Sequence, residues 1–170
     1  RDLKTANYLK NILNTNYYRI SVTTDVIGVE VCATIKNIFS MAIGAAPGLN
    51  KNKLQDNTYL NTSAALMRQS IHEMEIFANY LNGQKETVNG LAGLGDLYVS
   101  SAGGRNSKMG SLIGEGIVFS EAKKNKMPNV TVEGADLIFE IGKKVKEDFN
   151  DKKLPLMIAM INAILEDKKL

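Results

Sequence analysis

The sequence predicts an all-α protein made of several packed helices. Most apolar residues recur at the helical spacing of three to four positions, in stretches that end at glycine, proline or asparagine. The stretch from Asp25 to about Ala46 is apolar on almost every side, which is typical of a helix buried at the centre of a domain. Only residues 17–23, YYRISVT, have the aromatic and β-branched composition of a strand.

Length and composition indicate one globular domain. The 170 residues are 44% hydrophobic and 23% charged, which fits neither a disordered nor a fibrous protein. The formal net charge is +3, and acidic residues are interspersed among the lysines near the C-terminus. We therefore expect a solvated face of mixed charge and no nucleic-acid partner, since the sequence has no basic stripe with aromatic residues.

The apolar stretches do not indicate a membrane protein. Glu30 and Lys36 interrupt the longest of them, so no run reaches the roughly 18 apolar residues that a span needs. No charged leader with an apolar core opens the chain, and we expect a cytoplasmic location. The single Cys32 excludes an internal disulfide, and its position inside the apolar helix predicts a packing role.

The first 23 residues are expected to form one helix and one strand. Asp2 is a suitable cap for a helix over residues 3–14, whose apolar positions form a stripe. One strand over residues 17–23 cannot form a sheet alone. It is either a short strand with no partner or the last strand of a preceding domain, and the start at Arg1, without a methionine, favours a fragment.

Caps and stops define the remaining helices. Thr24 and Asp25 cap the central helix, and Pro47-Gly48 ends it. A polar loop over residues 50–57 leads to the longest helical stretch, about 59–81, which Asn82-Gly83 terminates. Further helices are predicted at residues 95–102, 111–116, 119–126 with Ser120 as cap, about 135–149, and from Pro155 onward.

Lys36 is an anomaly inside the apolar central helix. An unpaired buried ammonium costs several kcal/mol, so this lysine must be paired or must face a polar cleft. Asp96 is an acid in a segment otherwise poor in charge, and Ser100 lies one helical turn later on the same face. Lys36 and Asp96 lining one cleft would suit proton transfer, but a purely structural ion pair between two helices explains the same pattern.

A second polar group follows the glycine turn Gly103-Gly104. Arg105 and Asn106 stand where a new helix would begin, and an arginine fork beside helix N-terminal amides is a suitable phosphate site. A solvent-exposed loop is the alternative interpretation. GLAGLG at residues 90–95 is not the dinucleotide fingerprint G-x-G-x-x-G, and GGRNSKMG lacks the ending of a P-loop.

No metal site is expected. His72 is the only histidine, and no second histidine or cysteine accompanies it as a zinc site would require. A structural or surface role is therefore the better interpretation of His72.

Two long stretches resemble the signatures of NAD(P)-dependent glycerol-3-phosphate dehydrogenase. They are residues 24–44 (TDVIGVEVCATIKNIFSMAIG) and 89–110 (NGLAGLGDLYVSSAGGRNSKMG), and the resemblance continues through VEG at 132–134. It implies a two-domain, commonly dimeric enzyme that uses NAD or NADP. Residues 24–170 would be its helical substrate-binding and catalytic domain, of the 6-phosphogluconate-dehydrogenase-like type. Residues 1–23 would be the tail of the missing N-terminal Rossmann domain.

The resemblance also implies roles for individual residues near the reacting centre. Lys36 would protonate the carbonyl oxygen of dihydroxyacetone phosphate as hydride arrives, and would take the proton back from sn-glycerol 3-phosphate in reverse. Asn37 and Asp96 match residues that hold the substrate and the lysine, with Asp96 counted as catalytic. Ser100 stands where the family often has threonine, and would contact the substrate.

Three more residues match the phosphate and cofactor side of the family's site. Arg105 and Asn106 would hold the substrate phosphate, and Arg105 would also reach the cofactor. Glu133 would lie near the nicotinamide. The cofactor fingerprint itself is absent, so we expect the chain to be inactive alone. The alternatives are a related hydroxyacid dehydrogenase of the same fold or, without a Rossmann domain, a non-catalytic helical interaction module.

Overall fold

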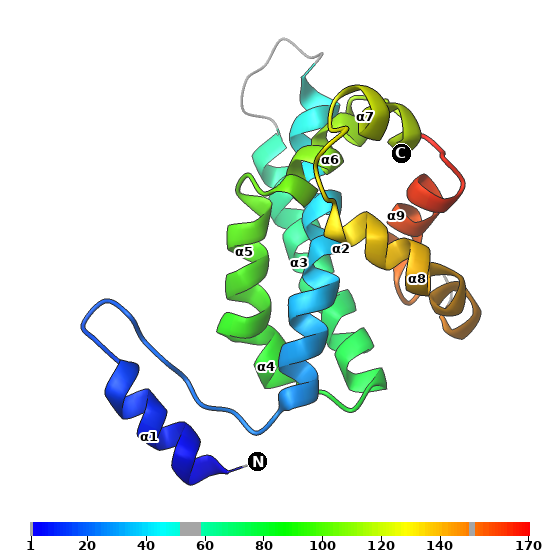
Figure 1. Cartoon of the computed structure of the whole chain (residues 1–170). Helices are drawn as coiled ribbons and strands as arrows, with labels where there is room; N and C mark the ends of the chain where they lie inside the picture. Colours follow the sequence, from blue (N-terminus) through cyan, green and yellow to red (C-terminus); the bar gives the residue numbers. More distant parts are fainter. Residues whose placement is uncertain (1, 52–58, 150–151) are drawn as a thin grey trace.

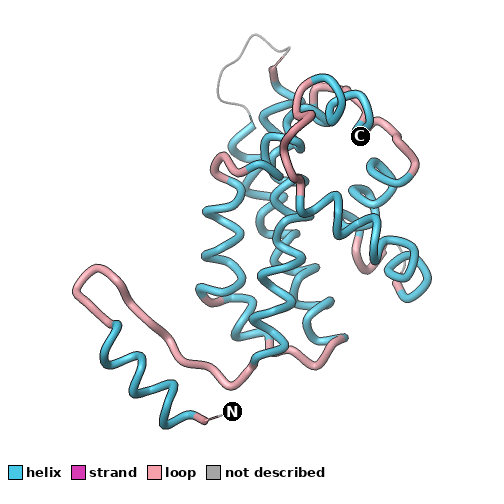
Figure 2. Tube along the Cα trace, in the orientation of Figure 1, coloured by secondary structure: helices cyan, strands magenta, loops and turns pink. Residues whose placement is uncertain are grey.

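The computed structural model describes residues 2–51, 59–149 and 152–170. Within these ranges the chain is helical and contains no strand (Figures 1 and 2). The helices in chain order are α1 (Leu3–Leu13), α2 (Val26–Asn50), α3 (Tyr59–Tyr80), α4 (Lys85–Asn89), the π-helical turn η1 (Leu91–Gly95), α5 (Asp96–Ser101), α6 (Arg105–Gly114), α7 (Phe119–Asn125), α8 (Glu133–Asp148) and α9 (Pro155–Leu165). The predicted all-α class is confirmed.

Helix α2 forms the centre of the domain. It runs through the middle of the helical body (Figure 1) and contacts α3, α5, α6, α8 and α9, and its residues 38–46 are all buried. Residues 26–49 are long and apolar enough to cross a membrane by length and composition alone, despite Glu30 and Lys36. Half of that stretch is buried against other helices, which is typical of the core helix of a globular domain.

Glycines let α2 and α6 approach backbone to backbone. A methyl group on Gly110 of α6 would lie 1.9 Å from the carbonyl oxygen of Met41, and one on Gly44 of α2 would lie 2.2 Å from that of Ser107. Gly134, in the first turn of α8, also lies close to α2, because a methyl group there would be 2.6 Å from the Asn37 carbonyl oxygen. The first turns of α6 and α8 are therefore held beside Asn37.

The start of α2 is capped as predicted. The buried carboxylate of Asp25 accepts the N–H of Gly28 at 2.9 Å and the N–H of Gln84 at 2.8 Å. One side chain thus satisfies an amide of the helix N-terminus and ties it to the start of α4.

The predicted end of α2 is wrong, because the helix runs through Pro47 to Asn50. Proline removes one backbone donor, but the last turn packs tightly on α6. A methyl group on Gly48 would lie 2.0 Å from the carbonyl oxygen of Ser111. Tertiary packing outweighs the one missing hydrogen bond at a helix end.

The strand predicted over residues 17–23 is also wrong. Figure 2 shows this segment as loop, and Tyr17 is 92% exposed. Its backbone bonds locally, with the N–H of Ile20 donating to Asn14 Oδ1 at 3.0 Å. A strand needs a partner strand to accept its ladder of hydrogen bonds, and the described residues offer none.

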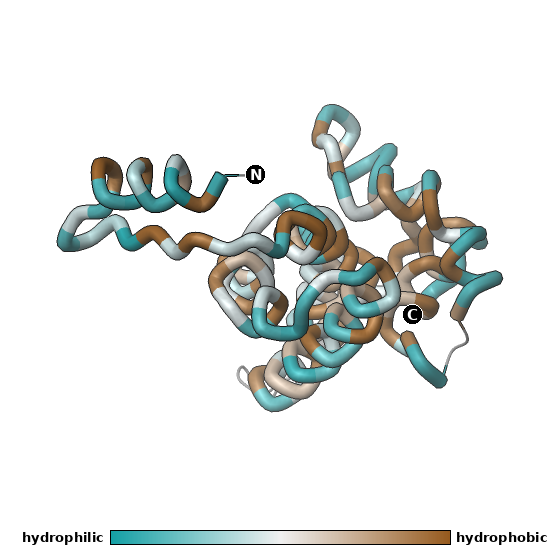
Figure 3. The backbone as a smooth tube through the Cα atoms, turned by 90° about the horizontal axis from the view of Figure 1, so that it is seen from below, coloured by the Kyte–Doolittle hydropathy of each residue, from teal (hydrophilic) through white to brown (hydrophobic). Residues whose placement is uncertain are grey.

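Helix α1 forms as predicted, with Asp2 accepting the N–H of Lys4 at 2.8 Å. None of its residues is buried. Figures 1 and 3 show α1 lying apart from the helical body, and its large apolar side chains are about half exposed or more: Leu3, Tyr8, Leu9, Ile12 and Leu13.

Other boundaries differ from the predictions at particular residues. Ser120 is not a cap, since α7 begins at Phe119 and Ser120 instead donates its N–H to Asp167 at 2.9 Å. Helix α6 occupies residues 105–114, so the short helix predicted at 111–116 is part of a longer one. Most of the loop predicted at 50–57 lies outside the described residues.

A buried carboxylate that the sequence did not single out holds the start of α9. Glu73 of α3 accepts the N–H groups of Leu156 and Met157, both at 2.8 Å, and an amide hydrogen of Gln69 at 3.0 Å. Burial raises the pKa of Glu73, and these hydrogen bonds oppose the rise. The interaction is an N-terminal cap supplied by another helix.

We predict that Gly110→Ala destabilises the domain by about 2 kcal/mol, because the new methyl group forces α6 away from α2. Urea unfolding followed by circular dichroism measures the change. Gly95→Ala is the matched control, since its methyl group would have no neighbour closer than 3.4 Å, in a helical backbone. Equal stability of Gly110→Ala and the unsubstituted chain would contradict the close helix contact.

We also predict a pH-dependent contribution from Asp25. Burial acts to raise the pKa of its carboxyl, but hydrogen bonds from Thr87, Gln84 and Gly28 together lower it below the ordinary 3.8. A lowered pKa in the folded state stabilises the protein above pH 3.8, and this contribution is lost as the pH falls through the folded value.

Asp25→Asn keeps a capping side chain but removes the titrating charge. We expect it to cost about 1 kcal/mol at pH 7. The difference from the unsubstituted chain should shrink as urea unfolding is repeated at pH values from 4 down to 2.5. A difference that stays constant over that range would mean that the carboxylate charge contributes nothing.

Candidate functional site

A polar pocket of about 360 Å³ lies where α2, α5, α6 and α8 meet. Its lining comprises Ala33, Lys36 and Asn37 of α2, Ser100 of α5, Gly104, Arg105 and Asn106 at the start of α6, and Glu133 at the start of α8. These segments are separated by up to a hundred residues in the sequence. The structure thus brings almost all of the predicted site residues into one pocket.

Lys36 pairs with Asp96, which supplies the partner that the sequence required. Lys36 Nζ donates to Asp96 Oδ2, and the two side chains are 18% and 38% exposed. The lysine lies at the pocket wall with its stem on the core helix, so the ammonium is paired without being sealed from solvent. An ion pair in this position holds α5 against α2 and also places a proton-carrying group at the pocket.

The π-helical turn η1 positions Asp96 at the start of α5. Gly93 allows the chain to fold tightly there, because a methyl group on it would lie 2.0 Å from the Val88 carbonyl oxygen. One turn after Asp96, Ser100 reaches the pocket lining, as the helical spacing predicted. The sequence indicated only a helix over residues 95–102, and both α4 and η1 were missed.

Arg105 and Glu133 form a second ion pair at the pocket. Arg105 Nη2 donates to Glu133 Oε1, and the side chains are 60% and 37% exposed. The two residues expected on the cofactor side thus contact each other. An anion that binds Arg105 must share the guanidinium with this carboxylate or displace it.

Asn106 is the most buried polar side chain of the pocket, at 6% exposed. Its Oδ1 accepts the N–H of Gly134 at 2.9 Å. Its Nδ2 donates to Asn37 Oδ1 at 3.1 Å and to Glu133 Oε2 at 3.2 Å. This one amide therefore links α2, α6 and α8.

The N-terminus of α6 opens the same pocket. Gly104 precedes the helix and provides no side-chain cap, and its carbonyl accepts the first helical hydrogen bond, from Lys108 at 2.9 Å. The amides of Arg105, Asn106 and Ser107 precede that first bond, so they have no acceptor within the helix. Such amides, together with an arginine, favour an anion.

Cys32 and His72 do not line the pocket. Cys32 is fully buried, and burial, with the carboxylates of Asp25 and Asp96, raises the pKa of its thiol to about 11. The thiol therefore stays protonated and packs in the core, as predicted. His72 is exposed on α3 and does not line the pocket.

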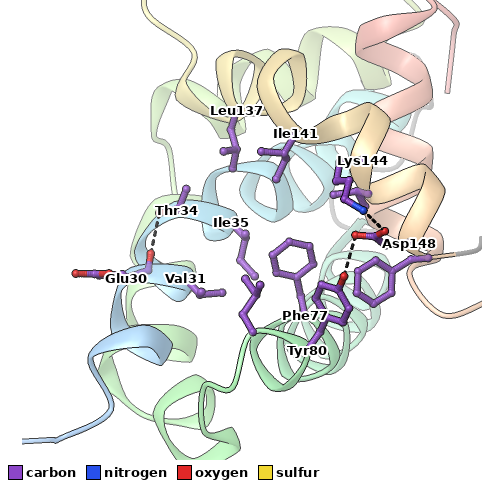
Figure 4. A pocket seen from close by; sticks show the side chains of 13 residues that line it. Glu30, Val31, Thr34, Ile35, Phe77, Tyr80, Leu137, Ile141, Lys144 and Asp148 are labelled. Carbon is purple, nitrogen blue, oxygen red and sulfur yellow. Dashed lines mark hydrogen bonds and ion pairs between the residues drawn. The ribbon is translucent and has the colours of Figure 1, made fainter.

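A separate cavity of about 490 Å³ lies between α2, α3 and α8 (Figure 4). Its walls are mostly apolar, with Val31, Ile35, Phe77, Leu137 and Ile141 among them. At its rim, Tyr80 donates its hydroxyl hydrogen to Asp148 at 2.9 Å, and Lys144 pairs with the same carboxylate. None of the predicted site residues lines this cavity.

Sequence comparisons with known proteins all point to one enzyme family. The family described as NAD-dependent glycerol-3-phosphate dehydrogenase C-terminus matches residues 25–170. An NADP(+)-dependent glycerol-3-phosphate dehydrogenase of Archaeoglobus fulgidus is 38% identical over 117 residues, covering 69% of this chain and 34% of that protein. The Agathobacter rectalis glycerol-3-phosphate dehydrogenase [NAD(P)+] is 32% identical over 171 residues, covering 99% of this chain and 47% of that protein.

A solved structure agrees with these sequences. The crystal structure of glycerol-3-phosphate dehydrogenase from Coxiella burnetii superposes with a TM-score of 0.79 at 28% identity, covering 99% of this chain and 49% of that one. The chain thus spans about half or less of the length of the proteins it matches.

Proposed function

The chain belongs to the NAD-dependent glycerol-3-phosphate dehydrogenases as their C-terminal domain, and from this we propose that it is the substrate-binding and catalytic domain of such an enzyme. The proposed reaction interconverts dihydroxyacetone phosphate and sn-glycerol 3-phosphate. The observation that supports it most strongly is the Lys36–Asp96 pair in a pocket shared with Arg105 and the uncapped start of α6. Family membership disfavours the hydroxyacid dehydrogenase of another family and the non-catalytic module.

NAD or NADP is the cofactor of this family, and when bound it supplies the hydride. The residues of this chain fit one side of such a cofactor. Glu133 presents a part-exposed carboxylate that can accept hydrogen bonds from a carboxamide, and Arg105 lies beside it. The dinucleotide fingerprint is absent from the sequence, so these two residues could bind only part of the cofactor.

We assign proton transfer to Lys36. As the carbonyl carbon of dihydroxyacetone phosphate gains hydride, its oxygen takes a proton from the Lys36 ammonium, and in the reverse direction the neutral amine removes that proton from the hydroxyl. Asp96 holds the Lys36 nitrogen at the pocket through their ion pair. Asn37 and Ser100, on neighbouring walls of the pocket, hydrogen-bond the substrate oxygens.

We assign phosphate binding to the start of α6. Arg105 supplies a charged fork, and the amides of the first turn, Asn106 included, supply neutral donors. The phosphate must compete with Glu133 for Arg105, because the two side chains form an ion pair.

In this family the C-terminal domain belongs with an N-terminal domain. We propose that residues 1–23 form the tail of that dinucleotide-binding domain and that the helical domain begins at Thr24. The family match begins at residue 25, none of the α1 residues is buried, and α1 lies apart from the helices that follow (Figure 3). The homodimer and the cytoplasmic location stay predictions.

The reaction is tested with this chain joined to its dinucleotide-binding domain. We expect the protein to oxidise NADH or NADPH only when dihydroxyacetone phosphate is present, measured by the loss of absorbance of the reduced nicotinamide. The chain by itself should show no turnover. Failure of the two-domain protein with both nucleotides would contradict the proposed reaction.

Replacing Lys36 tests the proton transfer. Lys36→Ala should lower kcat of the two-domain protein by about 10²- to 10⁴-fold, because a positioned proton donor is lost. Circular dichroism should show an intact fold, since Asp96 is partly exposed and remains hydrated. Lys51→Ala is the matched control, because Lys51 also pairs with a carboxylate, Glu115, but away from the pocket. Near-normal kcat in Lys36→Ala would exclude this role.

Replacing Arg105 tests the phosphate assignment. Arg105→Ala should raise KM for dihydroxyacetone phosphate by about tenfold to a hundredfold, since charge-assisted hydrogen bonds to the phosphate are lost. The slow reduction of dihydroxyacetone, which has no phosphate, should be unaffected. Arg68→Ala, an exposed arginine of α3, serves as control. An equal loss of kcat/KM with both substrates would mean that Arg105 does not act through the phosphate.

A further inference from the structure

The orientation of the Asn106 side-chain amide is dictated by its neighbours. The Gly134 N–H can only donate, so it must face the oxygen Oδ1, at 2.9 Å. The Glu133 carboxylate oxygen acts as acceptor, so it must face the nitrogen Nδ2, at 3.2 Å. With Asn106 6% exposed and packed at the meeting of three helices, neither partner can be exchanged for water without opening the site.

This orientation determines how Asn37 lies. The remaining hydrogen of Asn106 Nδ2 points to the Asn37 amide at 3.1 Å, so Asn37 must turn its oxygen toward Asn106. The Asn37 NH₂ group is then left on the other side. Asn37 is partly exposed and lines the pocket, and no described residue accepts a hydrogen bond from its Nδ2.

We propose that Asn106 is a positioning residue whose side chain turns the NH₂ group of Asn37 into the pocket. Two hydrogen bonds link Gly134 to Asn106 and Asn106 to Asn37. The backbone N–H of Gly134, on α8, sets the orientation of the Asn106 amide, and that orientation leaves the NH₂ group of Asn37, on α2, as a free donor. Both side-chain hydrogens of Asn106 are thereby used, and only its backbone amide, in the first turn of α6, remains as a donor for a ligand.

The consequence is a pocket lined mainly by donors. Lys36, Asn37 and Arg105 present hydrogens, and so do the first amides of α6. Such donors favour ligand groups that accept hydrogen bonds, namely a phosphate and a carbonyl or alkoxide oxygen, while Glu133 is the carboxylate acceptor of the lining. This inference deepens the proposed function, on which the identity of the substrate rests.

The first experiment needs no ligand. Hydrogen exchange with water is measured by NMR for the side-chain NH₂ groups of Asn37 and Asn106 in the full chain, assigned with Asn37→Ser. We expect the Asn106 hydrogens to exchange at least about tenfold more slowly than those of Asn37. Protection of the Asn37 hydrogens to the same degree, or fast exchange at Asn106, would overturn the proposal.

The second experiment is a double-mutant cycle on binding of sn-glycerol 3-phosphate to the two-domain protein, measured by calorimetry. Asn106→Ala should weaken binding about tenfold, and less than about twofold when Asn37→Ala is already present. If Asn106→Ala weakens binding equally with and without Asn37→Ala, the Asn106 side chain contacts the ligand directly, and the proposal is overturned.

Asn89→Ala is the matched control for this cycle. Asn89 also donates its Nδ2 hydrogens to a carboxylate, Glu75, and to a carbonyl oxygen, that of Lys85, but it lies outside the pocket. Its replacement should leave the affinity unchanged. If the unsubstituted protein binds no glycerol 3-phosphate, the proposed function fails, while the exchange measurement still decides the role of Asn106.

Discussion

Helices α2 and α6 pack backbone against backbone because glycine stands at their contacts, and the pocket depends on this packing. Methyl groups on Gly44, Gly110 or Gly114 would each lie within about 2.2 Å of a carbonyl oxygen of the other helix. With ordinary side chains at these positions, the helix axes would separate toward the usual 8–10 Å. The first turn of α6 would then move away from Asn37, and the hydrogen bond between Asn106 and Asn37 would be lost.

The charges of the pocket are organised in pairs. Lys36 faces Asp96, and Arg105 faces Glu133, so each cation has a carboxylate partner. Pairing explains how a core helix tolerates a lysine, because an unpaired charge at a partly buried position is costly. A bound anion can therefore gain affinity from Lys36 or Arg105 only by sharing that cation with its carboxylate or by replacing the carboxylate.

Features governed by local chemistry were predictable from the sequence. The Asp25 cap, the apolar core helix and the packing role of Cys32 all follow from residue type and spacing, and the structure confirms them. The resemblance of two sequence stretches predicted the family, which the family match confirms. It also predicted the polar residues that line the pocket, from Lys36 to Glu133.

The failures share a physical cause, since each depends on distant parts of the chain. Residues 17–23 have strand composition but no partner strand among the described residues, and Pro47 remains helical because α6 packs on the turn around it. Nothing in the local sequence singles out Glu73, because the helix start that it caps, that of α9, is more than eighty residues away.

The sequence by itself determined the helical class, the helix starts that carry their own caps, and the residue types that the site contains. Only the tertiary structure decided which of these residues pair: Lys36 with Asp96, Arg105 with Glu133, and Asn106 with Asn37. The reason is that helix periodicity and capping act over a few residues, whereas these pairs join groups 28 to 69 positions apart. Such pairs exist only once the glycine contacts have set the distance between the helices.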